Sequence, residues 1–561
     1  MPFRHVLAMI ALAAAGACST APAQPLTVAE MPAINTDAVL TDIRKLSSDE
    51  FGGRRPGTQG EQLTVQYLID QFKAAGAEPG NADGTWTQKV PLVSITPSDQ
   101  TPFVFAKKGG ASLSLKPHDD VVAFSQRVTE AIDLKNSDVV FVGYGVQAPE
   151  YHWDDFKGLD VKGKTIIMLV NDPPVLDPGR PGDLDPNVFG GKAMTLYGRW
   201  TYKYDRAAEA GAAAVLIVHE TAPAGYAWNV VQGFDGERFD LVAPDKNMGR
   251  AAIQGWISLD AATRLFKLAG LDYQKLKAQA ATRAFKPVAL NLAGSMSFKQ
   301  ALKTVNSQNV VAKIPGSDAQ LKNEYVVYSA HWDHFGTCDP VNGDNICNGA
   351  RDNASGTAMI VELAREFKKV APAPKRSILF VAVTSEEQGL LGSEYFARFP
   401  PYPVAKMLAN INVDEINVWG RTKDVTIIGL GASDLDDYAR DAAAEQGRTL
   451  TPDSEPEKGF YYRSDHFNFA KVGIPALDPD SGVDFIGKPA SYGKEKRDEW
   501  TEKFYHQPTD EVQTWWDLSG AAEDGKLFFA IGYRVANAAK FPEWKPGNEF
   551  RAVRERSIST K

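Results

Sequence analysis

The feature that most constrains this chain is a set of apolar runs that each end in a histidine or a carboxylate. Three runs have the apolar, partly β-branched composition of buried strands: residues 325–330, 377–383 and 408–413. The metal-binding types of side chain that follow them are His331, Glu386, Glu387 and Asp414. Because ligands bind at the carboxyl ends of strands in open α/β sheets, we expect these side chains to lie together.

Asp352 stands at the start of a predicted helix. Apolar residues recur on one helical face after it: Met359, Ile360, Leu363, Ala364 and Phe367. Imidazole nitrogen and carboxylate oxygen are ligands that zinc takes in catalytic sites. A strand-end His331, with Asp352 or Asn353 as a helix N-cap, would explain the same positions without a metal.

A histidine in a polar loop completes the set. His506 lies between Tyr505 and Asp510, in a segment with no regular periodicity. His331, His506 and the carboxylates would form two metal sites that share one carboxylate and leave a glutamate to spare. Paired metals about 3.5–4 Å apart are a known solution for hydrolysing amides and esters. The sequence therefore predicts a two-metal hydrolytic site.

Six motifs in the second half of the chain resemble those of metallopeptidase family twenty-eight, the di-zinc aminopeptidase and glutamate-carboxypeptidase group. In chain order they are Ser-Ala-His331-Trp-Asp333, Arg-Asp352-Asn-Ala-Ser-Gly, Ser-Glu386-Glu387-Gln-Gly, Asn-Val-Asp414, Arg463-Ser-Asp465-His466-Phe and Tyr505-His506-Gln-Pro-Thr-Asp510. The resemblance implies an α/β fold, with a mixed-sheet zinc-exopeptidase core of the phosphorylase/hydrolase-like type flanked by helices. It also implies two Zn2+ ions as cofactors.

The resemblance assigns a role to each matching residue. Five residues would bind zinc: His331 and Asp414 the first ion, Glu387 and His506 the second, and Asp352 both. Glu386 would take a proton from the water that the metals activate, and Tyr505 would donate to the oxyanion. Neighbouring residues that leave a strand point in different directions, so Glu387 can bind metal while Glu386 reaches the water.

Four further residues are predicted to orient the ligands or line the substrate pocket: Asp333, Arg463, Asp465 and His466. His466 and His506 compete for one ligand position, and the family motif favours His506. We expect His334 behind the ligands or at the rim of the site. Glu415 stands where the family more often has an apolar residue, and its role is open.

The chain divides into five predicted segments: a signal peptide (1–23), the N-terminal part of a peptidase domain (24–119), an insert (120–293), the catalytic di-zinc peptidase domain (294–545) and a charged, frayed tail (546–561). Short strands at 139–142, 165–170 and 213–218, with a helix near 204–210, make the insert resemble a β-rich protease-associated (PA) domain. In the family this domain commonly covers part of the active-site cleft. Between helices predicted at 36–47 and 61–75, we expect a loop with Arg54 and Arg55 in solvent. Support of the active site by one of these arginines is the alternative.

Residues 1–23 have the pattern of an export signal, with basic residues, a short apolar run and then small residues. Cleavage after Ala23 would give a soluble product, whereas a lipobox-like site would leave a lipid anchor on Cys18. Either route predicts a periplasmic, secreted or membrane-anchored protein. In such an oxidising compartment Cys338 and Cys347 would form a disulfide. Two free thiols in a soft metal site would fit the nitrogen and oxygen donors less well.

We expect an exported exopeptidase that removes residues from the amino terminus of peptide substrates. A formal net charge of −9 gives no reason to expect nucleic acid as a partner. A carboxypeptidase or dipeptidase of the same fold is the enzyme alternative, with Arg463 or Arg421 holding the terminal carboxylate. A relative that only binds partners is the non-enzyme alternative, and the complete ligand set argues against it.

Overall fold

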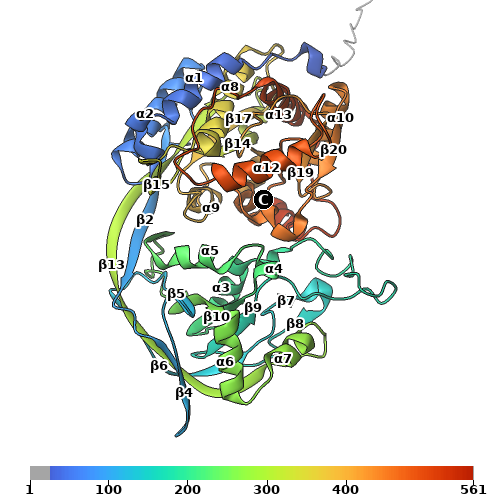
Figure 1. Cartoon of the computed structure of the whole chain (residues 1–561). Helices are drawn as coiled ribbons and strands as arrows, with labels where there is room; N and C mark the ends of the chain where they lie inside the picture. The colour runs from blue at the N-terminus through green and yellow to red at the C-terminus, as the bar shows by residue number, and fades with distance from the viewer. Residues whose placement is uncertain (1–25, 560–561) are drawn as a thin grey trace, which may run out of the picture.

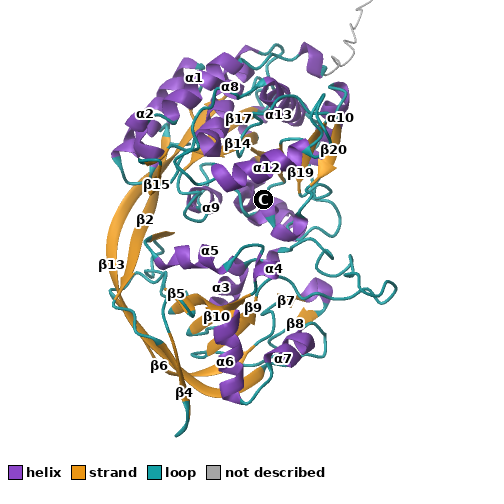
Figure 2. Cartoon of the chain, in the orientation of Figure 1, coloured by secondary structure: helices purple, strands orange, loops and turns teal. Residues whose placement is uncertain are grey.

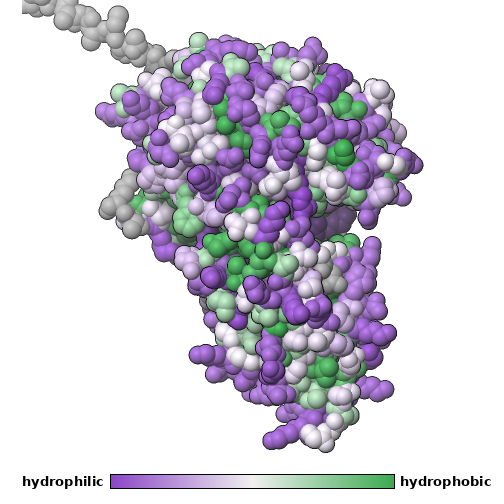
Figure 3. Space-filling model, turned by 90° about the vertical axis from the view of Figure 1, so that its left-hand side faces the viewer, coloured by the Kyte–Doolittle hydropathy of each residue, from purple (hydrophilic) through white to green (hydrophobic). Residues whose placement is uncertain are grey.

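A computed structural model describes residues 26–559, so the predicted export signal, with Cys18, lies outside the described residues. The chain forms two lobes joined along one side by the long strand β13 (Val288–Ile314) (Figure 1). The core lobe holds the elements before residue 99 and after β13, and the insert lobe holds those between. Figure 3 shows the side that bears β13, with a broad core lobe above a narrower insert lobe. Within residues 26–559, no helix has the length and apolar character that crossing a membrane requires.

The core lobe is built around three parallel strands. β14 (Tyr325–His331) pairs on one side with β17 (Ser377–Val383) and on the other with β18 (Met407–Asn412). β13 joins β17 in the antiparallel direction, and β21 (Ala476–Asp480) adds to β18 in parallel. The remaining strands of this lobe are β1 (Glu78–Pro79), β2 (Thr87–Ser98), β19 (Asp424–Ile428), β20 (Thr449–Pro452) and the hairpin of β15 (Gly336–Val341) and β16 (Asp344–Cys347).

Both faces of the core sheet are apolar, as expected for strands that are buried on both sides. In β14, Val326 and Tyr328 belong to one apolar cluster, whereas Tyr325 and Val327 belong to another. Residues of helices belong to both clusters, and Figure 2 shows the helices around the strands of this lobe. The helices of the core lobe are α1 (Thr36–Leu46), α2 (Gln59–Ala74), α8 (Gly356–Lys369), α9 (Leu391–Arg398), α10 (Leu435–Glu445), α11 (His466–Lys471), α12 (Tyr492–Lys503), α13 (Ser519–Asn537) and α14 (Arg551–Ser559).

Four strands of the insert lobe run parallel and are joined to the strands of the core lobe through β13. β9 (Thr165–Leu169) pairs with β6 (Ala131–Phe141) and with β10 (Ala214–His219), which pairs in turn with β12 (Ile253–Ser258). Its other strands are β3 (Phe103–Lys107), β4 (Ser112–Leu115), β5 (Val121–Phe124), β7 (Gln147–Ala148), β8 (Trp153–Asp154) and β11 (Arg238–Leu241). Its helices are α3 (Trp200–Glu209), α4 (Thr221–Ala224), α5 (Trp228–Gln232), α6 (Leu259–Ala269) and α7 (Tyr273–Ala280). The lobe is thus more helical than the predicted β-rich insert with its single helix.

Strand β13 crosses the predicted boundary between residues 293 and 294. Its first half pairs with β6 of the insert lobe, and its second half pairs with β2 and then β17 of the core lobe. The predicted boundary between residues 119 and 120 also falls inside a packed unit, since Phe103 and Leu115 share an apolar cluster with Phe141. A run in which apolar and polar residues alternate predicts a strand, but it does not reveal which lobe that strand pairs with.

The described part of the charged tail is folded, with residues 551–559 in α14, so our expectation of a frayed tail is wrong there. Arg554 of α14 is fully buried, and its Nη1 donates to the carbonyl oxygen of Val404 over 3.3 Å. Trp544 and Phe550 join an apolar cluster of the core lobe. Two aromatic side chains therefore hold this segment against the core despite its charge.

Candidate metal centre

The central strands of the core lobe bring three of the predicted metal ligands to one edge of the sheet. His331 is the last residue of β14, Glu387 lies four residues beyond β17, and Asp414 lies two residues beyond β18. Since these strands are adjacent and parallel, their carboxyl ends lie at the same edge. Asp352 comes to this edge from the irregular helical turn Ala350–Ser355, which leads into α8, and His506 comes from a turn between α12 and α13.

Asp352 lies between two histidines. Its Oδ1 is 3.3 Å from His331 Nε2, and its Oδ2 is 3.3 Å from His506 Nε2. His331 Nε2 is also 3.2 Å from Asp414 Oδ1, and His506 Nε2 is 3.2 Å from Glu387 Oε2. Two groups of nitrogen and oxygen donors therefore share one carboxylate, which is the arrangement that a pair of neighbouring cations needs.

The start of α8 leaves the Asp352 side chain free to face these histidines. Asn353 Oδ1 accepts the hydrogen bond from Gly356 N over 2.8 Å, at the first turn of the helix. Asn353 Nδ2 donates to the carbonyl oxygen of Val413 over 3.0 Å, which ties the helix to the end of β18. Of the two residues predicted as possible N-caps, Asp352 and Asn353, it is Asn353 whose side chain caps the helix.

His506 is positioned by a loop between α12 and α13. Its backbone has φ of 58°, an uncommon value for a residue with a side chain. The ring of Tyr505 stacks on its imidazole, with the centroids 3.7 Å apart, and remains 44% exposed. The Asp510 carboxylate accepts hydrogen bonds from Arg351 N (2.9 Å) and Asp352 N (3.0 Å), which joins this loop to the segment that carries Asp352.

His334 makes a direct contact with a predicted ligand. Its Nδ1 lies 2.5 Å from Glu387 Oε1, and its ring is buried. Glu387 thus directs one oxygen at His334 and the other at His506. A Cβ at Gly349 would lie 2.7 Å from the His334 ring, at a backbone φ of 53°, so the position accepts only glycine. His334 therefore fixes the orientation of Glu387.

Two more side chains, those of Ser464 and Asp333, form hydrogen bonds with residues of the centre. Ser464 Oγ donates to Asp414 Oδ2 over 2.5 Å, and Glu386 N donates to Asp333 Oδ1 over 3.0 Å. His331 Nδ1 lies 3.2 Å from the carbonyl oxygen of Asp333, which directs Nε2 towards the donors. Such hydrogen bonds fix the ring orientation of metal-binding histidines.

The electrostatics distinguish the two adjacent glutamates. Burial and Asp352 act to raise the pKa of Glu387, but His506 and His334 outweigh them and lower it to about 2. The pKa of Glu386 is raised well above its usual value by burial, and its neighbour Glu387 adds to this shift against the opposing attraction of His331. Glu387 is therefore an anion suited to binding a cation, and Glu386 is a carboxyl group that can hold a proton.

Asp465 and His466 lie at the start of α11. His466 Nδ1 is 3.5 Å from Asp478 Oδ2, and its ring centroid is 4.7 Å from that of Tyr461. Burial lowers the pKa of His466 to about 3, so the ring is neutral. Its described contacts include none of the predicted ligands, which favours His506 for the contested position. Asp465 is fully buried, and burial raises its pKa to about 7 against the attraction of His331.

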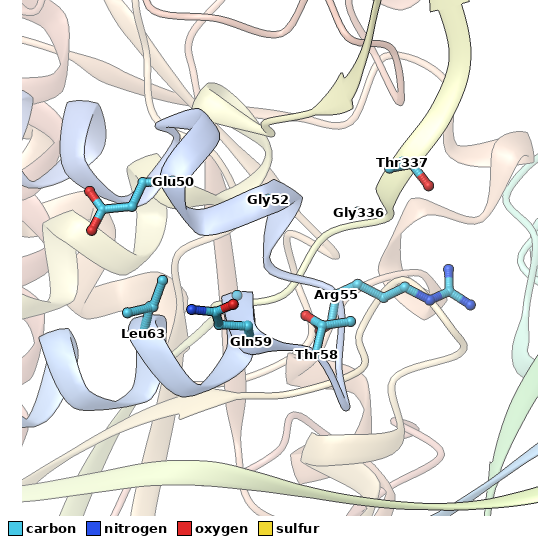
Figure 4. Close-up of a pocket in the computed structure, with 9 residues that line it drawn as sticks. Glu50, Gly52, Arg55, Thr58, Gln59, Leu63, Gly336 and Thr337 are labelled. Carbon is cyan, nitrogen blue, oxygen red and sulfur yellow. The ribbon is translucent and has the colours of Figure 1, made fainter.

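Arg54 is fully buried, so our expectation of a solvated loop is wrong for this residue. Its guanidinium donates to four carbonyl oxygens, those of Leu46, Trp332, Asn348 and Gly349. Arg55 instead lines a surface pocket that contains none of the predicted ligands (Figure 4), and it pairs with Glu237 over 2.6 Å. Arg54 therefore joins the segment that follows His331 to the segment that precedes Asp352.

We expect Arg54→Met to lower the free energy of unfolding by about 3 kcal/mol, because four carbonyl oxygens lose a charged donor. The control is Arg55→Met, since the partly exposed ion pair with Glu237 contributes less than about 1 kcal/mol. Urea denaturation of the two zinc-loaded variants measures both effects. If both variants lowered the free energy of unfolding equally, the buried hydrogen bonds of Arg54 would stabilise the fold no more than the contacts of Arg55 do.

The hairpin between His331 and Asp352 carries the predicted disulfide, which is confirmed. Cys338 and Cys347 are bonded across β15 and β16. A Cβ at Gly53 would lie 2.4 Å from the carbonyl oxygen of Gly336 and 2.6 Å from that of Cys347. The hairpin therefore packs directly on the segment that carries Arg54.

The donor chemistry of the centre fits zinc. Donor atoms of three groups lie within 4.8 Å of one another: His331, Asp352 and Asp414; His331, Glu386 and Glu387; and His334, Asp352 and Glu387. Imidazole nitrogen and carboxylate oxygen are common zinc ligands in catalytic sites. The described cysteines are joined to each other, so they supply no thiolate.

Residues 309–530, which include all five predicted ligands, match peptidase family M28. Aminopeptidase YwaD of Bacillus subtilis is 29% identical over 253 residues, which cover 44% of this chain and 48% of that protein. A probable zinc metalloprotease of Pyrenophora teres f. teres is 44% identical over 94 residues, which cover 17% of this chain and 18% of that protein. The chain thus spans less than half the length of these curated relatives.

Solved structures align over more of the chain. An aminopeptidase from Aneurinibacillus sp. strain AM-1 aligns with a TM-score of 0.49 and 19% identity, over 91% of this chain and 95% of that one. BSAP, a zinc aminopeptidase from Bacillus subtilis, aligns with a TM-score of 0.41 and 19% identity, over 90% and 95%. The sequence match and the motifs agree: residues 309–530 of this chain, which hold all six motifs, match peptidase family M28.

Proposed function

We propose that this protein is an exported exopeptidase that uses two zinc ions to remove residues from the amino terminus of peptides. The observation that carries the proposal is Asp352, whose two oxygens each face the histidine of a different donor group. The family match supports peptide-bond hydrolysis, and the relatives, a probable zinc metalloprotease and an aminopeptidase, support zinc and aminopeptidase activity. Export rests on the pattern of residues 1–23, with a lipid anchor on Cys18 as the alternative to a soluble form.

The residues of the centre divide the chemical work. The zinc ligands would be His331 and Asp414 for one ion, Glu387 and His506 for the other, and Asp352 for both. When bound, the two ions supply Lewis-acid chemistry that polarises a carbonyl group and makes water more acidic. Glu386 would take a proton from the attacking water and return it to the leaving amine. Tyr505 would donate a hydrogen bond to the oxyanion.

Negative charge beside the centre suits a free amino terminus. Glu415 follows Asp414 and pairs with Arg351 over 2.8 Å, with 19% of the Glu415 side chain exposed. Arg351 lies over the ring of Trp419, 4.4 Å from its centroid, which holds the pair in place. Beside the ligand carboxylates of the centre, this fixed carboxylate would attract the α-ammonium group of a peptide. In the same proposal the insert lobe is a PA domain that covers part of the cleft.

We expect the purified protein to bind two zinc ions per chain and to lose its activity on chelation, because the donors form two groups. Metal analysis, with a panel of aminoacyl and amino-blocked chromogenic substrates run with and without chelator, tests this. Full activity with one or no transition metal would contradict the two-metal proposal. Cleavage of amino-blocked substrates that keep a free carboxyl terminus would instead favour a carboxypeptidase.

A further inference from the structure

The disulfide hairpin of β15 and β16 contacts the predicted zinc ligand His506 both at its backbone and at its ring. The Sγ atom of Cys347 lies 3.7 Å from the carbonyl oxygen of His506, and Cys347 is fully buried. The ring of Phe335, the residue before β15, packs on the His506 imidazole with the ring centroids 4.5 Å apart. Since Gly336 pairs with Cys347, both contacts come from the base of the hairpin.

His506 depends on such contacts because its own backbone is unfavourable. Its φ of 58° lies in the left-handed region, where a residue with a side chain stays only if its surroundings hold it there. Tyr505 also stacks on the imidazole, but Tyr505 is itself 44% exposed and so adds little rigidity. The base of the hairpin is therefore the firmer of the two supports.

The hairpin in turn depends on its disulfide. The strands pair in regular register at Gly336 and Thr337, and the register is irregular from there to Val341. Among the described residues, the apolar clusters of the fold include no member of 336–346. A two-stranded hairpin without such packing is marginally stable in water. The bond between Cys338 and Cys347 closes the hairpin where the regular pairing stops, so it supplies the rigidity that reaches His506.

The ligands of the other zinc ion are held by other segments. Ser464 Oγ donates to Asp414 Oδ2 over 2.5 Å, and His331 Nδ1 lies 3.2 Å from the carbonyl oxygen of Asp333. None of these residues belongs to the hairpin. Loosening the hairpin should therefore affect His506 much more than His331 or Asp414.

The shared ligand Asp352 is also separated from the hairpin. The guanidinium of Arg54 donates to the carbonyl oxygens of Asn348 and Gly349, which lie between Cys347 and Asp352 in the chain. Asp352 N donates to the carboxylate of Asp510 over 3.0 Å. These contacts remain when the disulfide is broken.

The two sulfur atoms differ in their access to solvent. Cys338 is half-buried, and its exposed neighbour Thr337 lines the surface pocket of Figure 4. Cys347 is fully buried under the His506 backbone. A reductant can therefore attack the disulfide at Cys338, while the sulfur that leaves is the one in contact with the ligand loop.

We propose that the disulfide between Cys338 and Cys347 positions His506 for metal binding, so that the zinc site of Glu387 and His506 is complete only in the oxidised protein. This inference rests on the proposed two-zinc function and on export. Cytoplasmic thiols keep cysteines reduced, whereas disulfides persist outside the cytoplasm. The bond thus delays full zinc binding, and with it peptide hydrolysis, until the protein has left the reducing compartment.

Reduction by a dithiol reverses this state in two exchange steps. A thiolate of the dithiol bonds to Cys338 Sγ, the bond between the cysteines breaks, and Cys347 leaves as a thiolate that takes up a proton. The second thiolate of the dithiol then bonds to its first sulfur and releases Cys338, which is protonated in turn. The dithiol loses two electrons and becomes a disulfide, and the two cysteines gain these electrons.

The test compares the oxidised and reduced forms of the same folded protein. Zinc-free protein is treated with dithiothreitol, the reagent is removed by anaerobic gel filtration, and a gain of two thiols per chain verifies the reduction. Zinc is then titrated in competition with a chromophoric chelator. We expect two tightly bound ions in the oxidised form. In the reduced form one of them should bind about 10–100-fold more weakly, the effect of a group that supports a ligand. Oxidised glutathione should restore the tight binding.

Two variants show whether the effect passes through the disulfide and His506. The double variant Cys338→Ala with Cys347→Ala should bind its second zinc as weakly as the reduced wild type, and dithiothreitol should cause no further change. His506→Ala should bind one zinc ion with the same affinity in its oxidised and reduced forms, because the ligand through which the disulfide acts is absent. A merely structural disulfide would instead weaken the remaining ion in His506→Ala as well.

Equal zinc affinities in the oxidised and reduced wild type would overturn the proposal, and so would an equal loss of affinity for both ions. If the oxidised protein bound only one zinc ion, the two-zinc proposal would fail, and the disulfide proposal would stand only if reduction weakened that ion. If the double variant did not fold, the reduced wild type would decide the question, since it is prepared from folded protein and circular dichroism verifies that it stays folded.

Discussion

Glu386→Gln is expected to lower kcat by about 10³-fold while both zinc ions stay bound. The variant removes the carboxylate that moves the proton, and it removes no predicted ligand. Its amide keeps nearly the same volume, and the backbone hydrogen bond from Glu386 N to Asp333 is unaffected. Steady-state kinetics and metal analysis on the same preparation measure the two effects together.

The matched control is the neighbouring substitution Glu387→Gln. Glu387 faces His506 at 3.2 Å and His334 at 2.5 Å, so loss of its charge should release one zinc ion. The two adjacent changes thus separate proton transfer from metal binding. If Glu386→Gln lost a metal and Glu387→Gln kept both, the assignment of base and ligand would be reversed.

His506→Ala is expected to release one zinc ion and to reduce activity to background. His506 Nε2 lies 3.2 Å from Glu387 Oε2 and 3.3 Å from Asp352 Oδ2, so its loss removes the imidazole nitrogen that faces both of these carboxylates. A residue that only supports a ligand changes metal affinity or activity by about 10–100-fold. Zinc content after extensive dialysis, compared with wild type, distinguishes the two cases.

His466→Ala supplies the comparison, because both histidines lie in family motifs. The contacts of His466 are with Tyr461 and Asp478, so we expect both zinc ions to stay bound and kcat or KM to change moderately. Its buried ring also fills space, so the free energy of unfolding should fall. Loss of a metal from His466→Ala, with full metal content in His506→Ala, would contradict this part of the site.

The sequence by itself determined which site residues lie at the ends of strands and where the helices lie. His331 and Asp414 could be predicted at one edge because each follows an apolar run, and parallel neighbours end at the same edge. Periodicity likewise predicted helices at 36–47 and 61–75, which correspond to α1 (Thr36–Leu46) and α2 (Gln59–Ala74). Such patterns are local, because the backbone geometry of each element sets the spacing of its own side chains.

Only the tertiary structure decided which residues from distant segments of the chain contact each other. Ser464 and Asp510 lie inside motifs, yet their roles became visible only from their hydrogen bonds to Asp414 and to the backbone of Asp352. Arg54 and Arg55 are neighbours in one Gly- and Pro-rich loop. Arg54 is buried against the carbonyl oxygen of Trp332, 278 positions away, whereas Arg55 lies in an exposed pocket. Composition around a charge describes its chain neighbours, but its burial depends on the acceptors that other segments bring to it.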